Sequence, residues 1–203
     1  MRFDLLDKRL LILSALAAAI AFPAAAELDL QPRDLTPVTR LEAPAHSPVE
    51  LVRDGKARAV VFVADTDPSE TIELMVKELI EAIRLSTGAT LERVAEPAAA
   101  DRTAIVIGDC AETRQAGIDA GQIRIEGFVV KTAPNRVYLV GSTKALPPGG
   151  TRWAPWSNEG TAWAVADFLE RLVGVRWYWP AEVGGRSVVE SPSLVIPPAH
   201  YTD

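Results

Sequence analysis

Five tryptophans are concentrated in the last quarter of this 203-residue sequence. Trp153 and Trp156 fall in a Pro/Gly-rich stretch that we expect to be a loop, and Trp177 lies in an extended segment further on. Exposed indole rings offer a large apolar surface at little cost in side-chain entropy, which suits them to stack on the C–H faces of sugars. Trp153, Trp156 and Trp177 are therefore candidate carbohydrate-binding residues. The alternative is that these side chains cover the sheet or meet a neighbouring domain.

Acidic residues at the ends of predicted elements are the other candidates for chemistry. Glycoside hydrolysis needs two carboxyl groups about 5 to 10 Å apart across the scissile bond. The best placed acids are Asp65, Asp67, Asp109, Glu112 and Glu159. Loop acids and acids that begin helices are far more often solvated than catalytic, so we expect no catalytic residue in this chain.

The sequence lacks the usual motifs for nucleophilic, metal or cofactor chemistry. Cys110 is the single cysteine, and we expect a packed, inert thiol that forms no intramolecular disulfide. The two histidines, His46 and His200, lie far apart in Pro-flanked segments and do not match a zinc-binding pattern. There is no nucleophile elbow and no glycine-rich phosphate loop. The sequence therefore predicts neither a metal site nor a cofactor.

The N-terminus has the pattern of an export signal. Basic residues within the first nine positions precede an apolar run over 10–22. This run is shorter than the about 20 residues that cross a bilayer, and small residues at 24–26 provide a cleavage pattern. We therefore predict a signal peptide over 1–26 and a mature chain that begins at Glu27. We expect that chain to be periplasmic or extracellular, with no membrane attachment after cleavage.

Composition narrows the range of partners. The formal net charge of −6 argues against a nucleic acid and against an anionic membrane surface, because both are bound mainly through Lys and Arg. A neutral, sugar-like ligand is not disfavoured by this charge. Hydrophobic residues make up 48% of the chain and charged residues 24%, and the length suits one domain with a single sizeable core.

Periodicity and turn residues predict an α/β (α+β) domain over 49–198. Short apolar or β-branched runs predict strands at 49–52, 58–64, 89–94, 103–108, 127–132, 136–141, 176–179 and 193–196. Helices are predicted at 70–87, 109–117 and 161–173. We expect an extended lead-in over 27–48 and a tail over 199–203. This order indicates a small sandwich with a mixed sheet and with helices packed mainly on one face.

The segment over 160–180 reads GTAWAVADFLERLVGVRWYWP and resembles a signature of the α-glucuronidase N-terminal domain. Similar domains precede the catalytic barrel in β-hexosaminidases of family 20. The upstream order also fits, with a long helix at 70–87 followed by the strands TAIVIGD, EGFVVKT and NRVYLVGS. The resemblance covers about residues 48–198 and implies a fold like that of the hexosaminidase N-terminal domain.

The resemblance implies a non-catalytic accessory domain of a secreted carbohydrate-active protein that supports polysaccharide degradation. Two features depart from the family. Residues 142–159 intervene before the signature helix, and the family's catalytic carboxylates sit on a barrel that would start near Asp203. The implied partner is that barrel, on this chain or on a neighbouring one. The alternative is a free-standing exported glycan-binding module that uses its Trp-rich loop.

Overall fold

A seven-stranded sheet forms the centre of the computed structural model, which describes residues 38–65, 68–144, 158–179 and 185–203. Across the sheet the strands are β1 (Thr39–Arg40), β12 (His200–Thr202), β7 (Phe128–Ala133), β8 (Arg136–Gly141), β6 (Thr103–Ile107), β4 (Ala59–Val63) and β5 (Glu92–Val94). Strands β8, β6, β4 and β5 run parallel, whereas β7, β12 and β1 extend the sheet in antiparallel pairs. The mixed sheet predicted from the sequence is confirmed.

Continuous apolar runs bury the central strands on both faces. Strands β4 and β6 read AVVFV and TAIVI, and such β-branched runs fit strands that are covered on both sides. Alternate side chains divide between two cores. Val61, Ile105 and Leu139 belong to the core that the long helices share, whereas Val106 and Tyr138 belong to a second core on the opposite face.

Helix α2 (Glu70–Thr87) has the limits that its local sequence predicts. The Ser69 side chain accepts a hydrogen bond of 3.2 Å from the backbone nitrogen of Ile72 and so caps the first turn. Gly88 ends the helix in the left-handed conformation, with φ of 76°. The face with Ile72 and Leu79 is buried against the sheet and α4.

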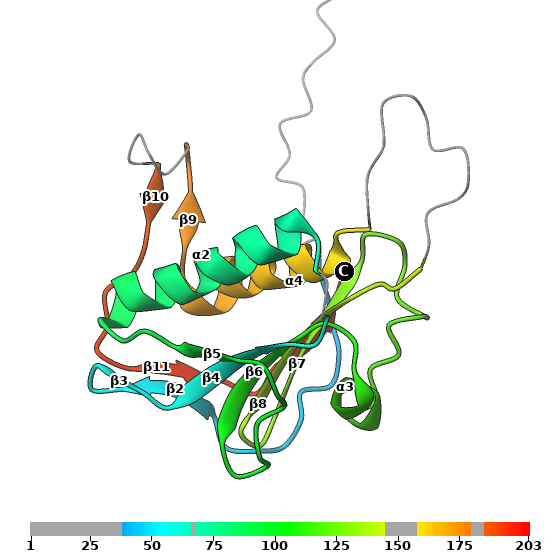
Figure 1. The fold of residues 1–203 in the computed structure, drawn as a ribbon, viewed down its shortest axis with the longest axis horizontal. Coiled ribbons are helices and arrows are strands. Elements are labelled where there is room, and N and C mark those ends of the chain that lie inside the picture. Colours follow the sequence, from blue (N-terminus) through cyan, green and yellow to red (C-terminus); the bar gives the residue numbers. More distant parts are fainter. Residues whose placement is uncertain (1–37, 66–67, 145–157, 180–184) are drawn as a thin grey trace, which may run out of the picture. The chain divides into compact units, whose positions relative to one another are not determined.

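Helix α4 (Gly160–Phe168) lies beside α2 on the same face of the sheet (Figure 1). It continues into a π-helical turn, η1 (Leu169–Val173), and ends at Gly174. The short helix α3 (Ala111–Gln115) lies on the other face, so the helices pack mainly on one face as predicted. Within the described parts of the chain, none of the helices combines the length and the apolar character needed to cross a bilayer.

Two smaller sheets complete the fold. One contains β11 (Leu194–Ile196), β2 (Val49–Arg53) and β3 (Lys56–Ala57) in that order. The turn between β2 and β3 has positive φ at both of its central residues, Asp54 and Gly55. The other is the hairpin of β9 (Arg176–Trp177) and β10 (Arg186–Ser187). Figure 1 shows this hairpin projecting beyond α2 and α4.

The predicted lead-in and tail each contain a strand of the central sheet. The lead-in over 27–48 contains β1, and the tail over 199–203 contains β12, which lies between β1 and β7. The central sheet thus includes residues on both sides of the segment over 49–198. The physical reason is that β12 is held by backbone pairing to β7 and by the buried Tyr201 ring, which contributes to the main core. Neither feature leaves a periodic pattern in so short a segment.

Candidate functional site

The three candidate tryptophans fall into two groups. Trp153 and Trp156 lie outside the described residues. Trp177 lies in β9 and keeps 39% of its surface exposed. The Asn158 side chain donates a hydrogen bond of 2.9 Å to the Lys144 carbonyl oxygen.

A single carboxylate on α2 orients the β9–β10 hairpin. Glu78 accepts a hydrogen bond of 3.3 Å from the indole nitrogen of Trp177 and an ion-paired contact of 2.5 Å from Arg186. Trp177 and Arg186 are also partners in the strand register. Glu78 on α2 thus holds the indole nitrogen of Trp177, while part of the Trp177 ring remains in contact with solvent.

Three consecutive aromatic residues make the hairpin unusually apolar for an exposed element. Tyr178 is 65% exposed and Trp179 is 73% exposed, next to the partly exposed Trp177. Leu74, also exposed, lies one helical turn before Glu78 on the same side of α2. We call Trp177, Tyr178 and Trp179 the hairpin surface. Contiguous exposed apolar side chains of this kind mark interaction sites on soluble proteins.

Trp163, on α4, does not belong to the hairpin surface. Its indole nitrogen donates a hydrogen bond of 2.7 Å to Glu126, in the loop before β7, and about half of the side chain is exposed. This contact ties the start of α4 to that loop. Trp163 therefore has an architectural role, although its ring is accessible.

The acids singled out in the sequence take different roles. Glu112 pairs with the buried guanidinium of Arg136 at 2.5 Å, and Glu159 accepts a hydrogen bond of 2.8 Å from the Ser69 hydroxyl. Asp67 lies outside the described residues. Asp65 and Asp109 follow β4 and β6, and the structure brings them to one edge of the sheet.

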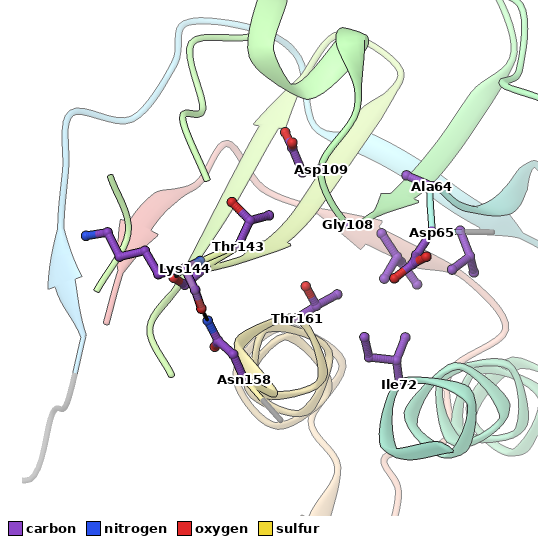
Figure 2. Close-up of a pocket in the computed structure, with 12 residues that line it drawn as sticks. Ala64, Asp65, Ile72, Gly108, Asp109, Thr143, Lys144, Asn158 and Thr161 are labelled. Atoms are coloured by element: carbon purple, nitrogen blue, oxygen red, sulfur yellow. Dashed lines mark hydrogen bonds between the residues drawn. The ribbon is translucent and has the colours of Figure 1, made fainter. Parts of the chain in front are cut away.

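A pocket of about 440 Å³ opens at this edge (Figure 2). Its walls come from the residues that follow β4, β6 and β8 and from the first turns of α2 and α4. The apolar lining is Val63, Ala64, Ile72, Ile107 and Gly108, and the polar lining is Asp65, Asp109, Ser142, Thr143, Lys144, Asn158 and Thr161. We call this cavity the edge pocket. Sequence reasoning flagged two of its acids but not the pocket, which depends on how the strands are ordered.

Three groups outside the edge pocket, Tyr138, Tyr201 and His200, have shifted pKa values. Burial, with the nearby Glu112 carboxylate, raises the pKa of Tyr138 to about 12. Burial, with the charge of Asp167, raises the pKa of Tyr201 well above its usual value. Burial and the charge of Lys131 lower the pKa of His200. These shifts follow from packing within the two cores and the β12–β7 pair.

The cysteine and the two histidines make local contacts within the fold. Cys110 is half-buried at the start of α3 and packs against the second core. The His46 ring contacts the Thr132 hydroxyl at 2.9 Å, and His200 pairs with Lys131 in the strand register. Among the residues that the structure describes, no group of three or more side chains could hold a metal ion.

Comparison with known proteins identifies the fold. No family model matches the chain, and no curated protein matches it. Solved structures of glycoside hydrolases are similar to it. A family GH115 4-O-methyl-α-glucuronidase with specificity for decorated arabinogalactans matches with a TM-score of 0.52 and 18% identity, over 75% of this chain and 18% of that chain. A Streptomyces plicatus β-hexosaminidase matches with a TM-score of 0.44 and 13% identity, over 79% of this chain and 24% of that chain.

The α-glucuronidase match defines the class of the fold. The described residues form a mixed α/β domain of the kind that glycoside hydrolase chains contain. The chain covers much less than two thirds of either matched structure. At these identities the similarity concerns the fold alone.

Proposed function

We propose that this chain is a non-catalytic accessory domain of an exported carbohydrate-active protein, periplasmic or extracellular, that supports polysaccharide degradation. It packs against a catalytic barrel, carried on the same polypeptide or on a neighbouring chain. The similar fold in the α-glucuronidase makes up 18% of a much larger chain, which supports a role as one domain among several.

The observation that carries the proposal is the hairpin surface. Folding has buried most large apolar side chains, yet Tyr178 and Trp179 remain largely exposed and Trp177 partly exposed on a projecting hairpin. Trp and Tyr are enriched among the residues that dominate the energy of protein–protein interfaces. Their rigid rings lose little side-chain entropy on binding, and Glu78 already restrains Trp177. The Trp177 side chain is therefore already ordered in the absence of a protein partner, which lowers the entropy lost on binding.

Site-specific photo-cross-linking tests this proposal. A photoreactive phenylalanine analogue replaces Tyr178 in one variant and Val195 in a control variant; Val195 is an exposed apolar residue of the separate β11–β2–β3 sheet. Both variants are exposed to the exported proteins of the native host, and the adducts are identified by mass spectrometry.

The proposal expects an adduct at Tyr178, absent at Val195, with a chain or segment that contains a glycoside hydrolase barrel. An adduct between two copies of this chain would instead make the hairpin surface a homodimer interface. Equal labelling at the two positions would show that Tyr178 contacts no specific partner. Either result would overturn the proposal.

A free-standing glycan-binding module is the second candidate function, and the partly exposed ring of Trp177 favours it. In this case the candidate residues Trp153, Trp156 and Trp177 stack on sugar rings. Affinity electrophoresis in gels that contain plant or bacterial polysaccharides distinguishes the two functions. Retardation that is lost in Trp177→Ala, or in Trp153→Ala with Trp156→Ala, would favour the module. Equal mobility of the chain with and without polysaccharide would favour a protein partner for the aromatic residues.

A further inference from the structure

The edge pocket lies where the direction of chain connection reverses. Strands β4 and β6 are neighbours, but the chain leaves β4 through α2 toward β5 on the outer side. It leaves β6 in the opposite direction, through α3 and β7, toward β8. In open α/β sheets, ligands bind in the crevice outside the carboxyl ends of strands at such a reversal. Ala64 and Asp65 follow β4, Gly108 and Asp109 follow β6, and all four line the pocket.

Close backbone packing forms one wall of the pocket and keeps it rigid. The Thr161 hydroxyl oxygen accepts a hydrogen bond of 3.1 Å from the backbone nitrogen of Gly141, at the end of β8. A Cβ atom on Gly141 would lie only 1.9 Å from the backbone nitrogen of Thr161. The first turn of α4 is therefore locked against the strand end, and Asn158 braces it through the Lys144 carbonyl oxygen. A preformed wall of this kind reduces the entropy that a ligand must lose to bind.

The groups that face the cavity include both hydrogen-bond acceptors and donors. Figure 2 shows the Asp65 carboxylate and the Thr161 hydroxyl directed toward the space between the strand ends and α4. The Asp65 carboxylate is an acceptor, and the Thr143 and Thr161 hydroxyls can donate. The Asp109 carboxylate, by contrast, is held by Arg114 and Thr113. Apolar side chains, among them Ile72, complete the lining.

We infer that the edge pocket binds a small neutral polyhydroxylated ligand, such as a monosaccharide or the end of a glycan. A sugar hydroxyl donates one hydrogen bond and accepts others, so it satisfies carboxylates and hydroxyls together. The apolar lining matches the C–H groups of the sugar ring. The cavity of about 440 Å³ falls within the range of small-molecule sites. This site is separate from the hairpin surface, and its existence does not depend on a barrel partner.

The charges around the pocket favour a neutral ligand over an anion. Among the described lining residues, Asp65 and Asp109 are acidic and Lys144 is basic. The Arg114 guanidinium, 2.5 Å from Asp109, is committed to that carboxylate. The Lys144 ammonium lies at the rim, where it donates to the Gln122 carbonyl oxygen at 3.3 Å. The described lining residues thus offer an anion no excess of positive charge.

The test is a two-dimensional amide NMR titration of the ¹⁵N-labelled chain. The probes are glucose, galactose, xylose and N-acetylglucosamine, with sodium phosphate and calcium chloride as separate arms. The inference expects saturable shifts, at millimolar concentrations of at least one sugar, for the amides of Asp65, Gly108, Thr143 and Thr161. Asp65→Ala should weaken binding of that sugar about tenfold, since a hydrogen bond to a charged group is lost.

Asp101→Ala is the matched control. Asp101 is an exposed loop acid that precedes β6, so it lies at the opposite edge of the sheet from Asp65. This variant should bind the sugar as the unaltered chain does. Shifts confined to the hairpin surface, the same loss in both variants, or no shift with any sugar would overturn the inference. So would shifts of the pocket amides with phosphate or calcium alone. The map on the unaltered chain decides the question even if Asp65→Ala fails to fold.

Discussion

Replacing Arg136 with methionine is expected to destabilise the fold far more than the same change at Arg114. Both guanidinium groups lie 2.5 Å from a carboxylate oxygen, Glu112 in one case and Asp109 in the other. They differ in burial, because the Arg136 side chain is 6% exposed and the Arg114 side chain is 58% exposed. Comparing the Arg136→Met and Arg114→Met variants therefore separates the effect of burial on stability from the effect of the distance between the charges.

The structure sets the expected loss in the free energy of unfolding for each variant. Removing one partner of a buried ion pair costs about 3–5 kcal/mol, and the partial exposure of Glu112 places the Arg136→Met loss near the lower end, at about 3 kcal/mol. Arg136 also donates to the carbonyl oxygens of Ala98, Ala99 and Arg102, so the loop before β6 loses its anchor. The exposed pair of Arg114 should contribute only about 0–1 kcal/mol.

Both losses of stability are measured by urea unfolding of the unaltered chain, Arg136→Met and Arg114→Met at pH 7. Unfolding is followed by tryptophan fluorescence and by far-ultraviolet circular dichroism. We expect a clear decrease in the unfolding midpoint for Arg136→Met with an unchanged dependence on urea concentration, which would indicate a change in stability alone. A difference of less than about 1 kcal/mol between the two variants would refute the reasoning, since burial would then have little influence on these ion pairs.

Three further predictions follow from the packing, the shifted tyrosine and the N-terminus. Gly141→Ala places a Cβ atom 1.9 Å from the backbone of Thr161 and should cost about 3 kcal/mol, whereas Gly121→Ala should stay within about 0.5 kcal/mol in the same urea assay. Equal midpoints would contradict the tight packing of α4. The protonated form of Tyr138 is favoured in the folded state, because its pKa is raised to about 12. Stability should therefore fall as pH rises from about 10 to 12, by about 1 kcal/mol at pH 11, and less so in Tyr138→Phe. Mass spectrometry of the chain exported from a bacterial host should find Glu27 as the first residue; retention of the full N-terminus would exclude the predicted cleavage.

Local signals explain why the long elements could be predicted from the sequence. Helix α2 has a capping Ser69, an apolar face at three- and four-residue spacing and a terminating Gly88, all within about twenty residues. The β7–β8 hairpin has Pro134 and Asn135 at its turn, and Asn135 adopts a φ of 60°. Such elements depend on neighbours in sequence, so a single sequence contains the information that positions them.

The short strands and the buried arginine depend on distant partners. Strand β12 exists because its backbone pairs with β7, about seventy residues earlier, and its three residues carry no periodic signal of their own. Arg136 looks like an ordinary charged residue at the start of a strand, yet it is buried because Glu112 and three loop carbonyl groups surround it. Neither its burial nor its partners could be predicted from residue type or spacing.

The edge pocket could not be predicted because it depends on the order of strands across the sheet. Asp65 and Asp109 each follow a strand, and that much is visible in the sequence. Their convergence requires β6 to lie next to β4, with β5 placed outside, and the sequence leaves that order open. The same limit applies to the hairpin surface, since only the structure shows that Glu78 holds Trp177 and that the neighbouring rings remain exposed.

The two proposed sites lie at opposite ends of the same helical element. Helix α4 and η1 run from Gly160 to Val173, a span of roughly 20 Å at about 1.5 Å per residue. Thr161, in the first turn, lines the edge pocket, whereas the hairpin surface follows the last turn after Gly174. A partner docked on the hairpin therefore need not cover the pocket, and one domain can contact a protein and a sugar at the same time. This separation also keeps the two tests independent, because Asp65→Ala leaves the hairpin intact and a cross-linker at position 178 leaves the pocket intact.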